Sequence, residues 1–542
     1  MKKTATVVAA LALAGTLVLT ACGRTNSPTS PSTTDTGGAP ATAGAQTLTV
    51  GTTDKIVTID PAGSYDAGSL QVEVQVYQFL YSFVPGSNVP TPDAAQSCDF
   101  TTPTEFTCKL KPDLKFANGD PLDAAAVKFS FDRQIAINDP NGPASMLGNL
   151  ASTAAPDATT VVFTLKQAND QTFEQVLATS AGPIVDPKVM SATALTPDAD
   201  IVKANAFSGP YTITSYTTND TVVYAPNPGY QGNMPAVANG GVTMKYYTSD
   251  TNLRMAISNG DIDVAYRSLT PTDLNTLKSD SNVTVLIAKG GEIRYIVFNM
   301  NTMPDGSSTY TDAQNLAIRQ AMASSVDRQA LSDKVYQGLY TPLCSYIPDG
   351  YVGANTAVCD AYGSTPDATK AAQYLSDAGV TTPVTLNIQY NPDHYGSSSD
   401  AEYAAIKTQL ESTGLFKVNL QSTEWVTYSK QRTQDAYPIY QLGWFPDYPD
   451  ADDYLTPFFG PDSFLANHYD NAQVQADLVK EVGETDQAAR TTEIQNLQTE
   501  IAKDLPTLPL LQGSQQAVYR NNVTGVSLGV SQNLFLAPLS KS

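Results

Sequence analysis

Histidine is nearly absent from this chain, whose 542 residues include only His394 and His468. Two histidines exclude an HExxH metalloprotease and any zinc site built from three histidines. A Walker A motif is also missing, so the chain does not itself hydrolyse a nucleotide. Residues 525–529 match the GxSxG nucleophile elbow, but no acid or histidine follows Ser527 to complete a triad. We therefore expect a protein that is not an enzyme and uses no metal and no cofactor.

Basic residues are also few, with 31 lysines and arginines against 53 aspartates and glutamates and a formal net charge of −22. Such a surface repels phosphate groups, which argues against nucleic acid and anionic lipid surfaces as partners. This balance describes the surface as a whole and does not make the ligand a cation.

Long apolar runs are missing except at the start of the chain. Two lysines precede the run 5–19, and residues 19–22 (LTAC) look like the lipobox of a bacterial lipoprotein. The pattern predicts a signal peptide over 1–21, cleavage before Cys22 and a diacylglycerol on its sulfur. An ordinary signal peptide or a transmembrane helix is the alternative, but the run is shorter than the about 20 residues that span a bilayer.

Residues 23–45 consist almost entirely of Thr, Ser, Pro, Gly and Ala, which predicts a lipidated cysteine and flexible tether over 22–45. No second apolar run is long enough to cross a membrane. We expect an exported, monomeric body on the extracytoplasmic face of the bacterial cell membrane, held there by its lipid alone. Its size exceeds one hydrophobic core, so two or three lobes are expected.

Cysteine is rare as well, and the chain beyond Cys22 has only Cys98, Cys108, Cys344 and Cys359. An even number at short separations in an exported chain predicts two local disulfides, 98 with 108 and 344 with 359. A zinc site is the alternative, although no CxxC spacing occurs.

Strand-like and helix-like patterns alternate along the folded body. Thr365 and Pro366 are expected to cap and open a helix that ends at Gly379. A strand, a helix and a strand between 384 and 420 form a βαβ unit, so its two strands should be parallel. Strands are expected over 106–110, 384–390, 416–420 and 438–442, and further helices over 122–133 and 402–413.

The expected strand 438–442 runs into an aromatic and acidic loop over 443–450 (GWFPDYPD). In α/β sheets ligands bind beyond the carboxyl ends of strands, so this loop lies where a binding site is expected. Calcium binding to aspartates 447, 450, 452 and 453 is an alternative, but the EF-hand glycine and terminal glutamate are missing. A solvated acidic loop is another.

Several motifs occur in an order that resembles the family 5 extracellular solute-binding proteins of ABC importers, which include oligopeptide-, dipeptide- and nickel-binding lipoproteins. The strongest block is 106–133, where FTCKLKP, KFANGDPL and VKFSFDR look like the family signature in order and spacing. Pro226 and Ser208 depart from the family's usual residues. Weaker matches lie at 59–61, 208–211, 227–230, 260–263, 318–321, 326–328 and 443–448.

The resemblance implies an α/β fold of the periplasmic-binding-protein type, a bilobal clam of the large type II class with an extra subdomain. It implies lobe I over 46–76, 187–290 and 506–542, the extra subdomain over 77–186 and lobe II over 291–505. Closure of the lobes would bury a solute and present it to an ABC permease and ATPase. The implied ligand is a short peptide. The alternatives are an oligosaccharide, an opine or a metal chelate on the same fold, or a surface sensor.

The same resemblance implies which residues line the cleft. Asp447 follows the Gly-Trp motif, where peptide-binding members pair an aspartate with the ammonium of the ligand through a charge-assisted hydrogen bond. Arg267 or Arg432 could fork onto a carboxylate. The implied ligand-binding residues are Tyr65, Asp66, Ala67, Tyr266, Arg267, Ser268, Trp425, Arg432, Gln441, Trp444, Asp447 and Tyr448.

Each of these roles has a plainer alternative. Asp447 could cap a turn or pair with an internal base, the two arginines could form surface salt bridges, and the two tryptophans, the only ones in the chain, could be core residues. Residues 65–68 are expected to form a strand edge of lobe I, to which a peptide backbone can add.

Overall fold

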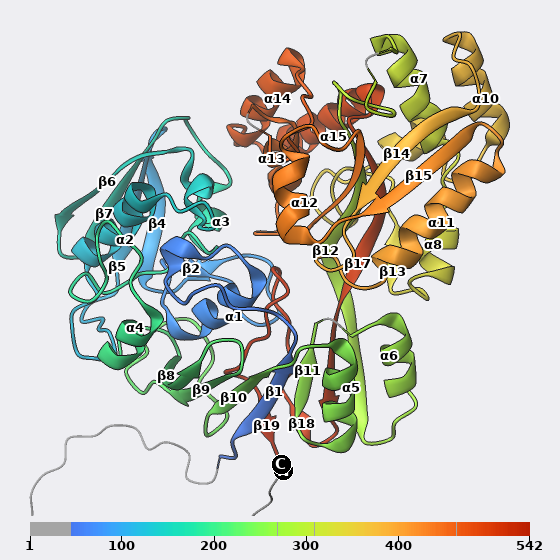
Figure 1. Ribbon diagram of the computed structural model, residues 1–542. Helices are drawn as coiled ribbons and strands as arrows, with labels where there is room; N and C mark the ends of the chain where they lie inside the picture. The colour runs from blue at the N-terminus through green and yellow to red at the C-terminus, as the bar shows by residue number, and fades with distance from the viewer. Residues whose placement is uncertain (1–44, 268, 308, 462) are drawn as a thin grey trace, which may run out of the picture. The chain divides into compact units, whose positions relative to one another are not determined.

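The computed structural model describes residues 45–267, 269–307, 309–461 and 463–542, in which helices and strands alternate (Figure 1). The predicted signal peptide, Cys22 and nearly all of the tether lie outside the described residues. Within the described residues, no helix is both long enough and apolar enough to cross a membrane.

The strands are β1 Leu48–Thr52, β2 Tyr81–Ser82, β3 Thr91–Pro92, β4 Ala95–Thr102, β5 Glu105–Leu110, β6 Leu150–Asp157, β7 Thr160–Leu165, β8 Tyr211–Thr217, β9 Thr221–Pro226, β10 Val242–Tyr246, β11 Val264–Tyr266, β12 Val283–Phe298, β13 Tyr340–Pro342, β14 Val384–Tyr390, β15 Phe416–Ser422, β16 Ile439–Trp444, β17 Thr507–Arg520, β18 Val523–Thr524 and β19 Ser540–Lys541.

The α-helices are α1 Ala67–Val76, α2 Ala124–Ile137, α3 Phe173–Val176, α4 Asp198–Ala204, α5 Asp250–Asn259, α6 Pro271–Leu277, α7 Asp312–Ala323, α8 Arg328–Lys334, α9 Ala357–Tyr362, α10 Ala368–Asp377, α11 Ser399–Ser412, α12 Trp425–Arg432, α13 Thr456–Phe459, α14 Ala472–Val482 and α15 Gln487–Asp504. The 3₁₀ helices are η1 Pro61–Gly63, η2 Ala144–Leu147 and η3 Asp452–Tyr454.

The largest sheet has 11 strands in the order β15-β14-β16-β12-β17-β11-β1-β10-β9-β8, with β13 paired to β17. Strands β14 and β15 are parallel along their whole length, and α11 lies between them in the sequence. The predicted βαβ unit is therefore confirmed. Strand β14 also pairs in parallel with β16, whose carboxyl end leads into the acidic loop.

Strands β12 and β17 are long and antiparallel, and they join the two halves of this sheet (Figure 1). The end of β12 pairs with β16, whereas the end of β17 pairs with β11. Between these regions, Lys289 pairs with Ser514 and Ile293 with Gln512, so residues 290–292 bulge opposite Gly513. A Cβ on Gly513 would lie 2.8 Å from the Glu292 carboxylate and 2.8 Å from the Tyr340 ring, so a larger residue there would force these two side chains to shift.

A second, four-stranded antiparallel sheet has the order β4-β5-β7-β6. Phe106, Phe163 and Phe173 meet edge to face in its core, with ring centroids 5.6 and 5.4 Å apart. These rings belong to a hydrophobic cluster drawn mainly from residues 80–184, separate from the cluster around β1 and β8–β10. The boundaries of the lobes and of the extra subdomain stay a prediction.

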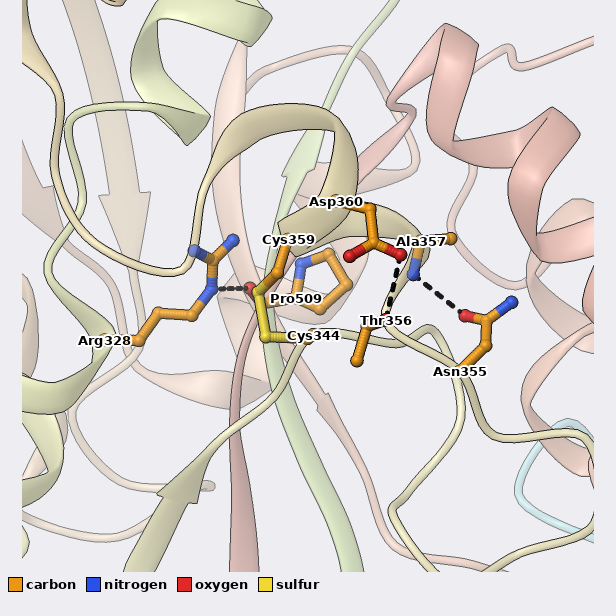
Figure 2. The surroundings of a disulfide bond; sticks show 8 residues. All are labelled: Arg328, Cys344, Asn355, Thr356, Ala357, Cys359, Asp360 and Pro509. Atoms are coloured by element: carbon orange, nitrogen blue, oxygen red, sulfur yellow. Dashed lines mark hydrogen bonds between the residues drawn. A yellow bond between two sulfur atoms is a disulfide. The ribbon is translucent and has the colours of Figure 1, made fainter.

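Both predicted disulfides are present, and they differ in their surroundings. Cys98 and Cys108 are buried and join β4 to β5, where they are directly paired. Cys344 and Cys359 are half-buried and join the segment after β13 to α9. Figure 2 shows Arg328 beside this second disulfide, with its Nε donating to the carbonyl of Pro509 at 2.8 Å.

Two local expectations are corrected. Helix α10 begins at Ala368 and is capped by Asp367, whose carboxylate accepts two backbone N–H groups, and not by Thr365. Residues 65–68 do not form a strand edge. Asp66 instead caps α1 by accepting from the N–H of Ser69 at 2.8 Å, so the chain turns helical at Ala67.

Candidate functional site

A cavity of about 120 Å³ lies beside the bulge at residues 290–292, where β12 pairs with β17. Its walls come from parts of the chain that are far apart in sequence: Arg267 and residues 269–271, β12, residues 394–398, Phe445, β17 and the turn that holds Gln532. The acidic loop predicted to form the binding site thus reaches this cavity through Phe445, two residues before Asp447.

Asp447 lies where three distant segments meet. Tyr65 donates its phenolic hydrogen to Oδ2 of Asp447, and the Ser531 hydroxyl donates to the Asp447 carbonyl at 3.0 Å. The loop is held in place by Asp453, whose Oδ2 accepts from the Trp444 indole N–H at 3.0 Å and from the Asp447 backbone N–H at 3.1 Å. The loop after β16 thus brings Asp447 into contact with Tyr65, near the start of the folded body, and with Ser531, near its end.

Asp450 of this loop pairs with Arg490 at 2.8 Å, whereas Asp447 and the nearby Asp453 have no positively charged partner among the described residues. Among the described residues, neither Asp447 nor Asp453 forms an ion pair, and the Asp447 carboxylate accepts a hydrogen bond only from Tyr65. Burial raises the pKa of Asp447 to about 7, and burial together with the charge of Asp447 holds the pKa of Asp453 well above its usual range. A cation bound here would relieve this repulsion. The part of the chain that the structure describes offers neither an internal base nor a turn for Asp447 to cap.

Arg267 reaches the cavity from the end of β11. Its backbone is left-handed, with φ 58°, and its Nε lies 3.3 Å from a carboxylate oxygen of Asp54. The guanidinium carbon lies 5.0 Å from the ring centre of Phe445, which is a cation–π contact. Arg267 thus bridges β11 and the acidic loop, and of the two predicted arginines it is the one that lines the cavity.

Arg294 forms a buried charge network that sequence reasoning missed. Its NH1 lies 3.1 Å from the Glu402 carboxylate and its Nε 3.3 Å from that of Glu292. Tyr340 donates to Glu292 at 2.8 Å and Tyr336 to Glu402 at 2.9 Å. The sequence did contain a signal for this network. Glu292 and Arg294 stand two apart on β12, so they share one face of the strand, and the residues around them are apolar.

His394 and Trp425 form an aromatic wall. Their rings are stacked, 3.8 Å apart and 5° from parallel. His394 lines the cavity and Trp425 lies behind it. Burial, with a further contribution from Arg267 and Arg294, lowers the pKa of His394 to about 3, so the imidazole is neutral at physiological pH.

Several predicted residues have packing contacts instead. Arg432 donates to the carbonyls of Phe464 and Leu465 at 2.6 and 3.3 Å, and its guanidinium lies 4.3 Å from the Phe464 ring centre. Trp444 contacts Phe458 and Phe464 edge to face. These contacts lie away from the cavity lining.

The remaining predicted residues are also placed. Gln441 accepts from the backbone N–H of Asn391 at 3.0 Å within the core. Tyr448 packs in the cluster of the four-stranded sheet, and Tyr266 is buried with its hydroxyl 3.3 Å from Asp54. The cavity lining does not include Asp66 or Ala67, which open α1, and Ser268 lies outside the described residues.

Comparison with known proteins places this arrangement in context. Residues 89–465 match the family model described as bacterial extracellular solute-binding proteins, family 5 Middle. An Escherichia coli K12 protein named "Probable D,D-dipeptide-binding periplasmic protein DdpA" is 28% identical over 490 residues, which covers 88% of this chain and 90% of that protein. A Salmonella paratyphi A protein named "Glutathione-binding protein GsiB" is 24% identical over 496 residues, covering 89% of this chain and 92% of that protein.

A solved structure of a dipeptide binding protein from Pseudoalteromonas sp. SM9913, in complex with Met-Leu, superposes with a TM-score of 0.76. It is 20% identical in sequence, and the match covers 92% of this chain and 100% of that one. The predicted α/β fold of type II periplasmic binding proteins is therefore confirmed. The chain belongs to the family 5 bacterial extracellular solute-binding proteins, which serve ABC importers by binding solute and are not enzymes.

Proposed function

We propose that this protein captures a short peptide with a free amino terminus, whose ammonium group binds Asp447. The observation that carries the proposal is the pair of carboxylates, Asp447 and Asp453, without an ion-pair partner in the described part of the chain. A charge-assisted hydrogen bond to an ammonium would supply the missing charge. A relative named for D,D-dipeptide binding and a similar fold solved with Met-Leu support a peptide ligand.

Arg267 is the side chain that we assign to a carboxylate of the ligand. Its Nε faces Asp54, and no hydrogen bond from NH1 or NH2 occurs within the described residues. Those two nitrogens can fork onto a carboxylate. The Arg267 guanidinium contacts the Phe445 ring, and Asp447 follows Phe445 by two residues, so we expect one short zwitterion to reach both side chains.

Closure around the ligand would bend the paired strands β12 and β17 at the bulge of residues 290–292. The bulge 290–292 and Gly513 interrupt the strand pairing there. The predicted boundary between lobe I and lobe II, at residues 290 and 291, falls within this bulge. Binding should lower the radius of gyration measured by solution X-ray scattering and raise the melting temperature. An unchanged scattering profile at saturating peptide would instead indicate a rigid surface site.

We further propose that the mature protein is anchored through a lipid on Cys22 and delivers its peptide to an ABC permease and ATPase. The lipobox-like residues 19–22 support the anchor. In a Cys22→Ala variant, folded protein should leave the membrane fraction, and its mass should lack the diacylglycerol. Retention of that variant in membranes, with unchanged mass, would contradict the anchor.

The deciding experiment compares one peptide with its N-acetylated form by calorimetry. Acetylation removes the ammonium charge and leaves the rest of the peptide unchanged, so binding should weaken by about 2–5 kcal/mol if a buried carboxylate loses its partner. Equal affinity for both forms would remove the peptide amino terminus from the site and favour a sugar, an opine or a chelate.

A further inference from the structure

The cavity beside Phe445 is surrounded by buried polar atoms that lack a hydrogen-bond partner among the described residues. Five such atoms belong to side chains that line it. They are the Ser514 hydroxyl, Gln516 Oε1, Gln532 Nε2, Glu292 Oε1 and Arg294 Nε. The last two lie 3.3 Å apart as an ion pair, whereas the other three belong to uncharged groups.

These uncharged groups are held in place by the backbone. Ser514 and Gln516 stand two apart on β17, so they share one face of the strand. Between them, Gln515 donates from Nε2 to the carbonyl of Gly529 at 2.9 Å. The same carbonyl accepts the backbone N–H of Gln532 at 3.0 Å. This turn brings Gln532, whose residue is only 6% exposed, to the cavity wall.

An unpartnered acceptor on Gln516 and an unpartnered donor on Gln532 are together complementary to an uncharged group that both donates and accepts a hydrogen bond, as an amide does. An amide carries an N–H donor and a C=O acceptor and has no charge. The cavity of about 120 Å³ can hold such a group, since a water molecule occupies about 30 Å³ in the liquid.

We propose that this cavity selects a ligand with an amide group beyond its amino-terminal residue, supplied by a carboxamide side chain or by a second peptide bond. This rests on the proposed function, because it takes the ligand to be a peptide held at Asp447. A ligand that fills the cavity with an apolar group leaves the buried polar atoms unpaired, and sites built to hydrogen-bond a ligand reject such analogues strongly.

The test is calorimetry of the wild-type protein with two pairs of peptides. Ala-Gln and Ala-Met have second side chains of similar size and differ in the amide. Ala-Ala-Ala and the depsipeptide Ala-Ala-lactate have the same length and the same terminal carboxylate, and they differ in whether the second linkage is an amide or an ester. We expect the amide-bearing member of at least one pair to bind about tenfold tighter or more, and the pair that shows the difference identifies the source of the amide. Equal affinities within both pairs would overturn the proposal.

A Gln516→Met variant should reduce that preference about tenfold while keeping the loss that acetylation causes, because Asp447 is untouched. The control is Gln495→Met, at an exposed position of α15 outside the cavity lining. A preference that survives Gln516→Met in folded protein would count against the amide cavity.

The two proposals fail differently. Peptides that need a free amino terminus but show no amide preference would refute only the amide cavity. Affinity that ignores acetylation would refute the peptide function, and the amide cavity with it.

Discussion

The acidic end of the site, around Asp447, and the cavity that Phe445 lines are built in opposite ways. Trp444, Asp447 and Asp453 lie within ten consecutive residues. The Asp453 carboxylate accepts hydrogen bonds from the Trp444 indole and from the Asp447 backbone. The cavity instead gathers side chains from the residues after β11, from β12 and β17, from the 394–398 loop and from the turn at Gln532. The first arrangement rests mainly on contacts within ten residues, to which Tyr65 and Ser531 add, and Asp447 and Asp453 have no ion-pair partner there among the described residues. The second is assembled by tertiary contacts, and its arginines already face carboxylates.

This difference predicts different energetics at the two ends. At the acidic end Asp447 and Asp453 have no ion-pair partner among the described residues, although Asp450 pairs with Arg490, so ligand charge should dominate at Asp447. In the cavity each arginine already faces a carboxylate, Arg267 that of Asp54 and Arg294 those of Glu292 and Glu402. Removal of a charge at the acidic end should therefore cost more binding energy than removal of a charge in the cavity.

The largest effect is expected from Asp447→Asn. It leaves a bound ammonium buried without its counter-charge, so peptide affinity should fall by about 2–5 kcal/mol in calorimetry. The loss should not add to that from N-acetylation, because both changes delete one interaction. Asp200→Asn, at an exposed position in the first turn of α4, is the matched control and should change nothing. Fully additive losses would show that Asp447 does not contact the amino terminus.

Arg267→Met should have the next largest effect. The substitution removes the charged group that donates hydrogen bonds to the ligand carboxylate, so binding should weaken by about 1.5–3 kcal/mol. A peptide with an amidated carboxyl terminus should lose affinity for the wild type but not for this variant. Arg254→Met removes an arginine whose Nε lies 2.9 Å from Asp273 away from the cavity lining, so peptide affinity should be unchanged in that control. Wild-type protein that binds amidated peptides equally well would refute the assignment.

Lowering the pH should affect binding and stability in opposite directions. The raised pKa of Asp447, about 7, means that protonation removes the carboxylate charge as the pH falls, so peptide affinity should drop up to about tenfold per unit below that value. The folded protein holds this proton more tightly than the unfolded chain, so the free energy of unfolding without ligand should rise as pH falls from 8 to 6. Asp447→Asn should flatten both profiles, as measured by calorimetry and thermal melts. An unaltered pH profile in that variant would assign the titration to other groups.

Tyr65→Phe should give the smallest effect. It deletes the hydroxyl that donates to Asp447 and leaves the ring in place, so peptide affinity should change by about 0.5–1.5 kcal/mol. The pKa of Asp447 should rise further, because the hydrogen bond from Tyr65 lowers it. Peptide binding should therefore weaken at a higher pH in the variant than in the wild type. A larger loss than that of Asp447→Asn would mean that Tyr65 contacts the ligand directly.

The sequence alone determined the features that depend on short stretches of chain. The family motifs, the βαβ unit of β14, α11 and β15 and the two disulfide pairs follow from periodicity, spacing and parity within tens of residues. The acidic loop after β16 was visible for the same reason, because its charged and aromatic residues are consecutive.

Only the tertiary structure decided which side chains line the cavity. Arg267 and Arg432 were equivalent as sequence, and packing sends Arg267 to the cavity and Arg432 to the carbonyl groups of residues 464 and 465. Gln516 and Gln532 carry no sequence signal, since a glutamine becomes informative only when folding buries it without a partner. Local patterns specify helices, strands and caps through contacts between near neighbours, whereas the cavity depends on burial that distant segments create together.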